Sequence, residues 1–270
     1  MSEPLLSVSG LKTHFRLKQP GIWGTARTIK AVDGVSFDIA QAEVLSIVGE
    51  SGSGKSTVGR TLTHLEKATG GTAVFLGQEI LQMSPAAFRP LRRHIQMIFQ
   101  DPFASLNPRL TIAQTLGEPL RIHGLVKNRD EERATVSETL ELVGLDPEVM
   151  NRHPHEFSGG QRQRIGIARV MALKPKLVIA DEAVSALDVS IQAQVLNLIK
   201  KLQRDSGASM LFISHDLGVV RHISDRVAVM YQGKIVEMGD KRQIFEAPQH
   251  DYTRKLLSAI PRIAAGREAA

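Results

Sequence analysis

The chain has 270 residues, of which 42% are hydrophobic, 23% are charged and none is cysteine. This composition is typical of one or two globular domains and excludes a disordered or collagen-like chain. The lack of cysteine excludes disulfides, thiolate metal sites, iron–sulfur clusters and cysteine nucleophiles.

The net charge of +6 is compatible with an anionic partner such as nucleic acid, nucleotide or lipid. Aromatic residues make up only 4%, so we do not expect a surface that stacks single-stranded bases. The longest apolar run, residues 227–231, is far shorter than a membrane span. No apolar stretch follows Glu3, so we expect no signal peptide and a chain that folds in the cytosol.

Four short apolar runs predict strands, at residues 44–48, 95–99, 177–180 and 210–213. They hardly alternate between apolar and polar residues, which is expected of parallel strands buried on both faces. Helical patterns lie between them, and residues 191–205 repeat apolar side chains at steps of three and four. Strands that alternate with helices predict an α/β fold.

The middle of the chain, residues 101–156, has no strong strand pattern but several helical stretches broken by proline and glycine. The clearest one, residues 133–143, stops at Gly144, a natural helix terminator. We therefore predict a helical subdomain inserted into the α/β core. Residues 19–28 contain Pro20, Gly21 and Gly24 and predict an irregular loop.

A glycine-rich segment after the first of these strands fits the pattern G-x-x-x-x-G-K-[ST]. It consists of Gly49, Glu50, Ser51, Gly52, Ser53, Gly54, Lys55, Ser56 and Thr57. Glycines allow several backbone N–H groups to point at one anion. Lys55 would bring positive charge to the β- and γ-phosphates, and the Ser56 hydroxyl is an oxygen ligand suited to Mg²⁺. A helix predicted over residues 57–65 would direct its positive end at the same charge. The segment predicts binding of a nucleoside triphosphate.

Two carboxylates, Asp181 and Glu182, end the third predicted strand. Asp181 could hold Mg²⁺ through water, and Glu182 could orient the attacking water or accept its proton. Paired acids after a strand are also common as helix N-caps or in surface turns. The phosphate loop favours the catalytic interpretation.

A second anion site is predicted at Ser158, Gly159, Gly160 and Gln161. Ser158 and Gln161 have the spacing of a capping box, and the two glycines leave the first turn of the next helix without side chains. An ordinary capped helix does not explain two successive glycines, each of which costs a helix about 1 kcal/mol.

These motifs and their order make the chain resemble the ATP-binding subunits of ABC transporters. Residues 49–57 match Walker A, residues 158–161 the signature and residues 177–181 Walker B. Gln100 resembles the Q-loop glutamine, Asp188 belongs to a D-loop-like segment at 185–188, and His215 resembles the switch histidine.

The resemblance implies a P-loop NTPase (RecA-like) core with a mainly parallel sheet, an N-terminal antiparallel β subdomain and an inserted α-helical subdomain. We expect a single ABC ATPase domain over residues 1–270. Within it, residues 1–100 and 161–240 would form the nucleotide-binding core and 101–160 the helical signature subdomain. Residues 241–270 would form a C-terminal extension.

The resemblance also implies that two such subunits pack head to tail and enclose ATP, completing one another's sites. Ser56, Gln100 and, through water, Asp181 would serve Mg²⁺. Glu182 would polarise the attacking water. Lys55 and the loop amides would bind the phosphates, and His215 would contact the γ-phosphate. Residues 158–161 would complete the partner's site, and Asp188 would line the interface.

An aromatic residue upstream of Walker A stacks on adenine in this family, and Phe15 is the candidate. Trp23 is the rival. The alternative is that Phe15 is a core residue of the first strand.

Residues 100–108 and the tail from residue 248 to residue 261 resemble the oligopeptide/dipeptide/nickel importer branch. The tail begins with a motif at residues 248–253, which consists of Pro248, Gln249, His250, Asp251, Tyr252 and Thr253. That branch implies uptake of di- or oligopeptides, two transmembrane permease subunits, an extracytoplasmic solute-binding protein and a second ATPase that is identical or a paralogue. A coupling helix of the membrane subunit would dock on the helical insert. The chain would be peripheral, at the cytoplasmic face of the inner membrane, and would not bind nucleic acid.

Three positions depart from the family pattern: Asp251 and Ala183 stand where proline is usual, and Ala42 where glycine is usual. We expect Ala183 to loosen the placement of Glu182 modestly without abolishing hydrolysis. Two alternatives remain open, an exporter ATPase and a soluble ABC ATPase of nucleic-acid handling. The second requires a long coiled coil between Lys55 and Ser158, where no sustained heptads occur.

Overall fold

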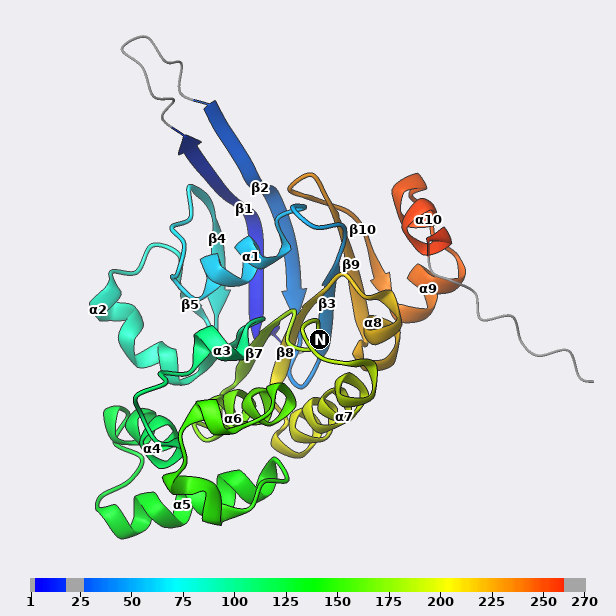
Figure 1. Cartoon of the computed structure of the whole chain (residues 1–270). Coiled ribbons are helices and arrows are strands. Elements are labelled where there is room, and N and C mark those ends of the chain that lie inside the picture. The colour runs from blue at the N-terminus through cyan, green and yellow to red at the C-terminus, as the bar shows by residue number, and fades with distance from the viewer. Residues whose placement is uncertain (1–2, 18–26, 260–270) are drawn as a thin grey trace, which may run out of the picture.

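A computed structural model describes residues 3–17 and 27–259 of the chain. Two β-sheets form its frame (Figure 1). The first sheet has the order β2-β1-β4-β5 and is antiparallel, with Leu6 of β1 opposite Ile39 of β2 and Phe75 of β4. Its strands are β1 (Leu6–Leu17), β2 (Arg27–Ile39), β4 (Gly70–Phe75) and β5 (Gln78–Glu79).

The second sheet has the order β10-β9-β3-β8-β7-β6 and is parallel except for the β10–β9 pair. Its strands are β3 (Val44–Val48), β6 (Ile95–Ile98), β7 (Leu177–Asp181), β8 (Ser209–Ser214), β9 (Arg226–Tyr231) and β10 (Lys234–Asp240). The antiparallel sheet, the mainly parallel sheet and the helical region confirm the predicted fold class.

Helices surround the second sheet, and those between β6 and β7 form the green, all-helical part of Figure 1. The α-helices are α1 (Lys55–Leu62), α2 (Pro85–Phe88), α3 (Pro102–Ser105), α4 (Ile112–Ile122), α5 (Arg129–Leu142), α6 (Gly159–Met171), α7 (Val189–Ser206), α8 (Leu217–Ile223), α9 (Lys241–Glu246) and α10 (Asp251–Ser258). The 3₁₀ turns are η1 (Arg89–Arg93), η2 (Pro147–Asn151) and η3 (Pro154–Glu156). Among the described residues, no helix is both long and apolar enough to cross a bilayer.

The parallel strands separate two apolar cores, which explains why their sequences do not alternate. In β3, Val44 and Val48 face the core shared with the helical region. Leu45 and Ile47 face the core shared with α1 and the antiparallel sheet. All residues of β3, β7 and β8 are buried, as predicted for strands covered on both faces.

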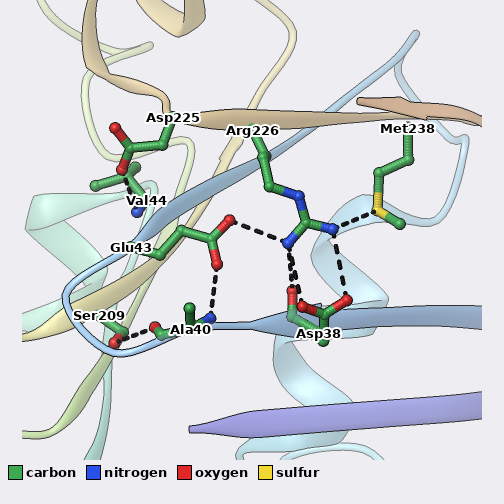
Figure 2. A network of polar contacts seen from close by, with 8 residues as sticks. All are labelled: Asp38, Ala40, Glu43, Val44, Ser209, Asp225, Arg226 and Met238. Carbon is green, nitrogen blue, oxygen red and sulfur yellow. Dashed lines mark hydrogen bonds and ion pairs between the residues drawn. The ribbon is translucent and has the colours of Figure 1, made fainter. Parts of the chain in front are cut away.

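A polar network lies at the amino ends of the parallel strands (Figure 2). Arg226 at the start of β9 donates to Asp38 of β2 at 3.2 Å and to Glu43 at 3.1 Å. The other Glu43 oxygen accepts the N–H of Ala40 at 2.6 Å, and Asp225 accepts the N–H of Val44 at 2.8 Å. The network ties the antiparallel sheet to the parallel one on the side opposite the motif residues.

Several predicted bounds need correction. The helix predicted at 57–65 begins at Lys55, because Gly54 provides its N-cap. It ends at Leu62, shortly before His64 turns left-handed at φ 59°. The helix predicted at 133–143 begins at Arg129, because the Asn128 side chain caps it by accepting the N–H of Glu131.

The remaining differences are smaller. β6 ends at residue 98, whereas β7 and β8 extend one or two residues beyond their predicted runs. In the segment predicted as a loop at 19–28, residues 27 and 28 belong to β2, and residues 19–26 lie outside the part of the chain that the structure describes.

Candidate functional site

The phosphate loop connects β3 to α1 and depends on glycine at two close approaches. A Cβ on Gly49 would lie 2.1 Å from the carbonyl oxygen of Met230, and one on Gly54 would lie 1.9 Å from that of Ala31. Gly54 also has φ 103°, a conformation that side chains disfavour. Its lack of a side-chain cap leaves the first N–H groups of α1 available to an anion.

Lys55 lies inside this loop, with only 4% of its surface exposed. Its ammonium donates to the carbonyl oxygens of Gly49 at 2.7 Å and Glu50 at 2.8 Å. Burial lowers the pKa of Lys55, and the charges of Glu182, Asp181 and Glu50 oppose that shift. The loop therefore holds a cation at its centre, fixed by its own carbonyl groups.

A cavity of about 240 Å³ opens beside the loop. It brings together six loop residues with Gln100 and Glu182, which sequence analysis had assigned to one site. Its lining residues are Ala31, Ser51, Gly52, Gly54, Lys55, Ser56, Thr57, Gln100 and Glu182. Ala31, which precedes the loop by some twenty residues, was missed because no local pattern marks it.

Three polar side chains meet where neighbouring parallel strands end. Gln100 follows β6, Glu182 follows β7 and His215 follows β8. The Gln100 amide donates to Oε2 of Glu182 at 3.1 Å, and Nδ1 of His215 lies 3.2 Å from the same oxygen. These contacts fix one carboxylate at the cavity wall.

The backbone of Glu182 is itself unusual. Its φ is 48°, and the left-handed conformation costs an ordinary residue about 1–2 kcal/mol. Its N–H is held by the carbonyl oxygen of Ile213 at 2.9 Å. Retained strain of this kind is typical of functional positions, since surrounding contacts must maintain it.

Asp181 and Ser56 form a pair of oxygen donors next to the cavity. The Ser56 hydroxyl donates to Oδ1 of Asp181 at 2.6 Å, and Asp181 is 1% exposed. Burial raises the pKa of Asp181, and the nearby Glu182 charge adds to the rise, while the bond from Ser56 and the charge of Arg60 oppose it. A bound divalent cation would relieve the cost of this buried carboxylate.

The predicted signature residues begin α6 and form the expected capping box. The N–H of Gln161 donates to the Ser158 hydroxyl at 3.3 Å, and the N–H of Ser158 donates to the Gln161 side chain at 3.0 Å. A Cβ on Gly160 would lie 2.5 Å from Ile191 of α7, whereas Gly159 has no such close neighbour. Packing against α7 therefore accounts for one of the two glycines, which sequence analysis had attributed to anion binding.

None of residues 158–161 lines the cavity beside the phosphate loop. Asp188 does not line it either; it precedes α7 and forms no capping bond through its side chain. The next residue, Val189, is 84% exposed. Within one chain, the two predicted anion sites are thus separate.

The adenine-stacking prediction stays a prediction. Phe15 lies in β1 opposite Ile29 of β2 and is only partly buried. It is absent from both apolar cores and from the cavity lining. Trp23 lies outside the described residues.

A contact that sequence analysis did not foresee reaches the loop from the C-terminal part of the chain. The N–H of Glu50 donates to the hydroxyl of Tyr252 in α10 at 3.1 Å. The N–H of Gly233, between β9 and β10, donates to the carbonyl oxygen of Ser53 at 3.0 Å. The only signal in the sequence was that Tyr252 belongs to the motif at 248–253.

Comparison with known families gives two matches. The model of the ABC transporter family matches residues 32–185, more than half of the chain. The model of the oligopeptide/dipeptide transporter C-terminal region matches residues 236–270.

Curated relatives extend the match over nearly the whole chain. The glutathione import ATP-binding protein GsiA of Escherichia coli K12 is 58% identical over 259 residues, which are 96% of this chain and 41% of that protein. GsiA of Shigella dysenteriae serotype 1 matches with the same values. The chain therefore spans about two fifths of the length of these relatives.

Solved structures show the same architecture. The dimeric ATP-binding cassette MJ0796, in a post-hydrolysis state bound to ADP and Pi, superposes with a TM-score of 0.78 at 27% identity, covering 88% of this chain and 99% of that one. CbiO1 of Clostridium perfringens, part of the ABC transporter complex cbiONQ, gives a TM-score of 0.76 at 27% identity over 97% of this chain and 98% of that one.

Proposed function

We propose that this chain, which belongs to the ABC transporter family, binds and hydrolyses ATP to drive the uptake of a solute. The observation that carries the proposal is that Glu182, which Gln100 and His215 contact, lines the same cavity as the phosphate loop. A nucleotide whose phosphates lie on the loop would place its terminal phosphate beside the Glu182 carboxylate.

The proposed chemistry is the attack of water on the γ-phosphate. Lys55 and the amides of the loop residues that line the cavity bind the phosphates. Glu182 orients the water and accepts its proton as the new P–O bond forms and the bond to ADP breaks. His215 and Gln100 hold the Glu182 carboxylate, at 3.2 and 3.1 Å. His215 would also contact the γ-phosphate.

Mg²⁺ fits the donor set next to the loop. Ser56 and Asp181 offer hard oxygen ligands 2.6 Å apart, and Gln100 can add its amide oxygen. The buried Asp181 is an acid whose ionised form needs a nearby cation. When bound, Mg²⁺ would neutralise charge on the phosphate oxygens.

The proposed working form contains two ATPase subunits. The cavity of about 240 Å³ is smaller than the ~300–1,000 Å³ of a complete ligand site, and residues 158–161 lie outside it. A second subunit, either a copy or a paralogue, would supply its own signature helix to cover the nucleotide, with Asp188 at the interface. The exposed Val189 supports a contact surface there.

The proposed partners in the membrane are two permease subunits. A cavity of about 520 Å³ lies between the core and the helical region, and its lining includes Phe88, Met97, Leu110 and two exposed apolar residues, Leu65 and Ile122. This groove, which combines apolar with polar and charged side chains, suits the coupling helix of a permease. The chain would then be peripheral at the cytoplasmic face of the inner membrane, and an extracytoplasmic binding protein would deliver the solute.

The proposed solute is a di- or oligopeptide or a peptide-like molecule. Support comes from the match of residues 236–270 to the oligopeptide/dipeptide transporter C-terminal region and from the glutathione import proteins among the relatives. These matches favour import over the exporter and nucleic-acid alternatives.

Two experiments test the proposal. The purified chain should release phosphate from MgATP, and Lys55→Ala should abolish this release. The chain reconstituted in liposomes with its permease subunits and binding protein should show ATPase stimulation and uptake with dipeptides or glutathione. Failure of MgATP to bind would contradict the ATPase. Stimulation by Ni²⁺ alone, or export, would contradict the peptide-import part.

A further inference from the structure

The C-terminal motif at residues 248–253 contacts the phosphate loop, a role not included in the proposed function. The N–H of Glu50 donates to the Tyr252 hydroxyl at 3.1 Å, linking residues that are 202 positions apart. Glu50 belongs to the loop but does not line its cavity. This N–H points toward α10.

Tyr252 is held firmly enough to act as a support. Its side chain is buried at 9% exposure, and its ring packs on that of Tyr231 with 4.2 Å between centroids. Tyr231 follows Met230, whose carbonyl oxygen lies against Gly49 at the start of the loop. The end of β9 thus contacts both the loop and the tyrosine that binds it.

Two other motif residues, Gln249 and His250, fix α10 in place. The two carboxylate oxygens of Glu237 in β10 accept the N–H groups of Gln249 at 2.7 Å and of His250 at 3.0 Å. His250 in turn caps α10, because its Nδ1 accepts the N–H of Tyr252 at 3.1 Å. The position of the Tyr252 hydroxyl therefore follows from an anchor on the second sheet.

We propose that Tyr252 is a positioning residue for the nucleotide, acting through the phosphate loop, and that the 248–253 motif serves to hold it there. The proposal rests on the proposed ATP site. A loop fixed at Glu50 keeps its remaining amides aligned for phosphate before ATP arrives, so less order has to be acquired on binding. Because the loop grips phosphate throughout the reaction, the contact should favour affinity rather than the chemical step.

The test compares Tyr252→Phe with Tyr231→Phe. Each change removes one hydroxyl and keeps the ring pair. The Tyr231 hydroxyl accepts a bond only from its neighbour Gln232, among the contacts of the described residues. Three quantities are measured for each chain: the Kd for MgATP by calorimetry, KM and kcat for phosphate release, and hydrogen exchange of the Glu50 amide by NMR without nucleotide.

We expect Tyr252→Phe to raise Kd and KM about 3- to 10-fold, because one hydrogen bond is lost. The kcat should stay within about twofold of the wild-type value. Exchange at Glu50 should accelerate. Tyr231→Phe should match the wild type in all three quantities. Equal Kd values for both variants and unchanged protection of the Glu50 amide would overturn the proposal.

Glu237→Gln gives a second route to the same result, since it weakens the anchor of α10 without touching Tyr252. It should raise Kd in the same direction, whereas Glu246→Gln, at an exposed position in α9, should not. If the wild type itself fails to bind MgATP, the proposed function is wrong. The exchange rates at Glu50 still decide whether Tyr252 holds the loop.

Discussion

Charged residues have opposite roles at the amino ends and at the carboxyl ends of the parallel strands. At the amino ends, Arg226, Asp38 and Glu43 satisfy one another, and a backbone N–H takes up the second oxygen of Glu43 (Figure 2). At the carboxyl ends, Glu182 faces an open cavity and is contacted only at one oxygen, by Gln100 and His215, among the contacts of the described residues.

The difference separates stability from function within one sheet. A charge whose partners all belong to the chain contributes to folding and has nothing left for a ligand. A carboxylate with one oxygen that no described residue contacts, on a strained backbone beside a cavity, is available to a reacting molecule. Changes at the two ends of the strands should therefore have different consequences: lost turnover at the carboxyl ends and lost stability at the amino ends.

The largest effect is expected at the carboxyl ends of the parallel strands. Glu182→Gln should bind MgATP with nearly unchanged Kd, because Lys55 and the loop remain, but should lower kcat by at least about 100-fold, since the amide cannot accept a proton. Calorimetry and phosphate release measure the two quantities. Near-normal turnover would remove Glu182 from its assigned role.

At the amino ends of the strands, Arg226→Met should lower the free energy of unfolding by about 2 kcal/mol, because it leaves the poorly exposed Glu43 without its cation. The Kd for MgATP should not change. Arg242→Met, which removes the cation of an exposed pair with Glu246, serves as control and should lower the free energy of unfolding far less. Denaturant unfolding separates the cases; equal losses would contradict the account.

The anchor of α10 predicts a pH dependence. Burial alone would raise the pKa of Glu237, but hydrogen bonds from the N–H groups of Gln249 and His250 lower it below its ordinary value. The folded chain thus favours the charged carboxylate. The stabilisation is present above the pH at which glutamate ordinarily titrates, about 4.3, and is lost as the pH falls through the lower, folded value.

Unfolding measured against pH should accordingly show wild type about 1 kcal/mol more stable than Glu237→Gln at neutral pH, with the difference vanishing in acid. A difference that grows on acidification would have the wrong sign and would contradict this anchor.

The smallest effect is expected at Ala42, in the turn before β3, where φ is 58°. Ala42→Gly should stabilise the chain by about 0.5 kcal/mol, since relief of the left-handed strain exceeds the added freedom of the unfolded chain. The matched change Ala40→Gly, at a position without positive φ, should destabilise it. Destabilisation by both changes would contradict the strain assigned to Ala42.

The sequence was most informative where a function depends on neighbouring residues. The glycines and Lys55 of the phosphate loop, the two acids at the end of β7 and the Ser158–Gln161 capping box are local patterns, and the structure has them where the patterns predicted. The two-sided burial of the central strands was likewise visible as a lack of alternation.

Contacts between distant segments could not be predicted in this way. Three contacts depend on how distant elements pack, and no repeat or spacing in the sequence indicates them. They are the bond from Glu50 to Tyr252, the approach of Gly160 to Ile191 and the place of Ala31 in the cavity. The early start of α1 was missed for a related reason, because Gly54 caps it through backbone conformation and close packing against Ala31 rather than through a side chain.

The central claim is that one chain holds only half of each reaction centre, and turnover measured against pairing tests it most directly. Phosphate release from MgATP is followed over a dilution series while mass photometry gives the fraction of paired molecules in the same samples. The account predicts turnover per chain that rises and falls with the paired fraction. Full turnover in a sample containing only single chains would contradict it.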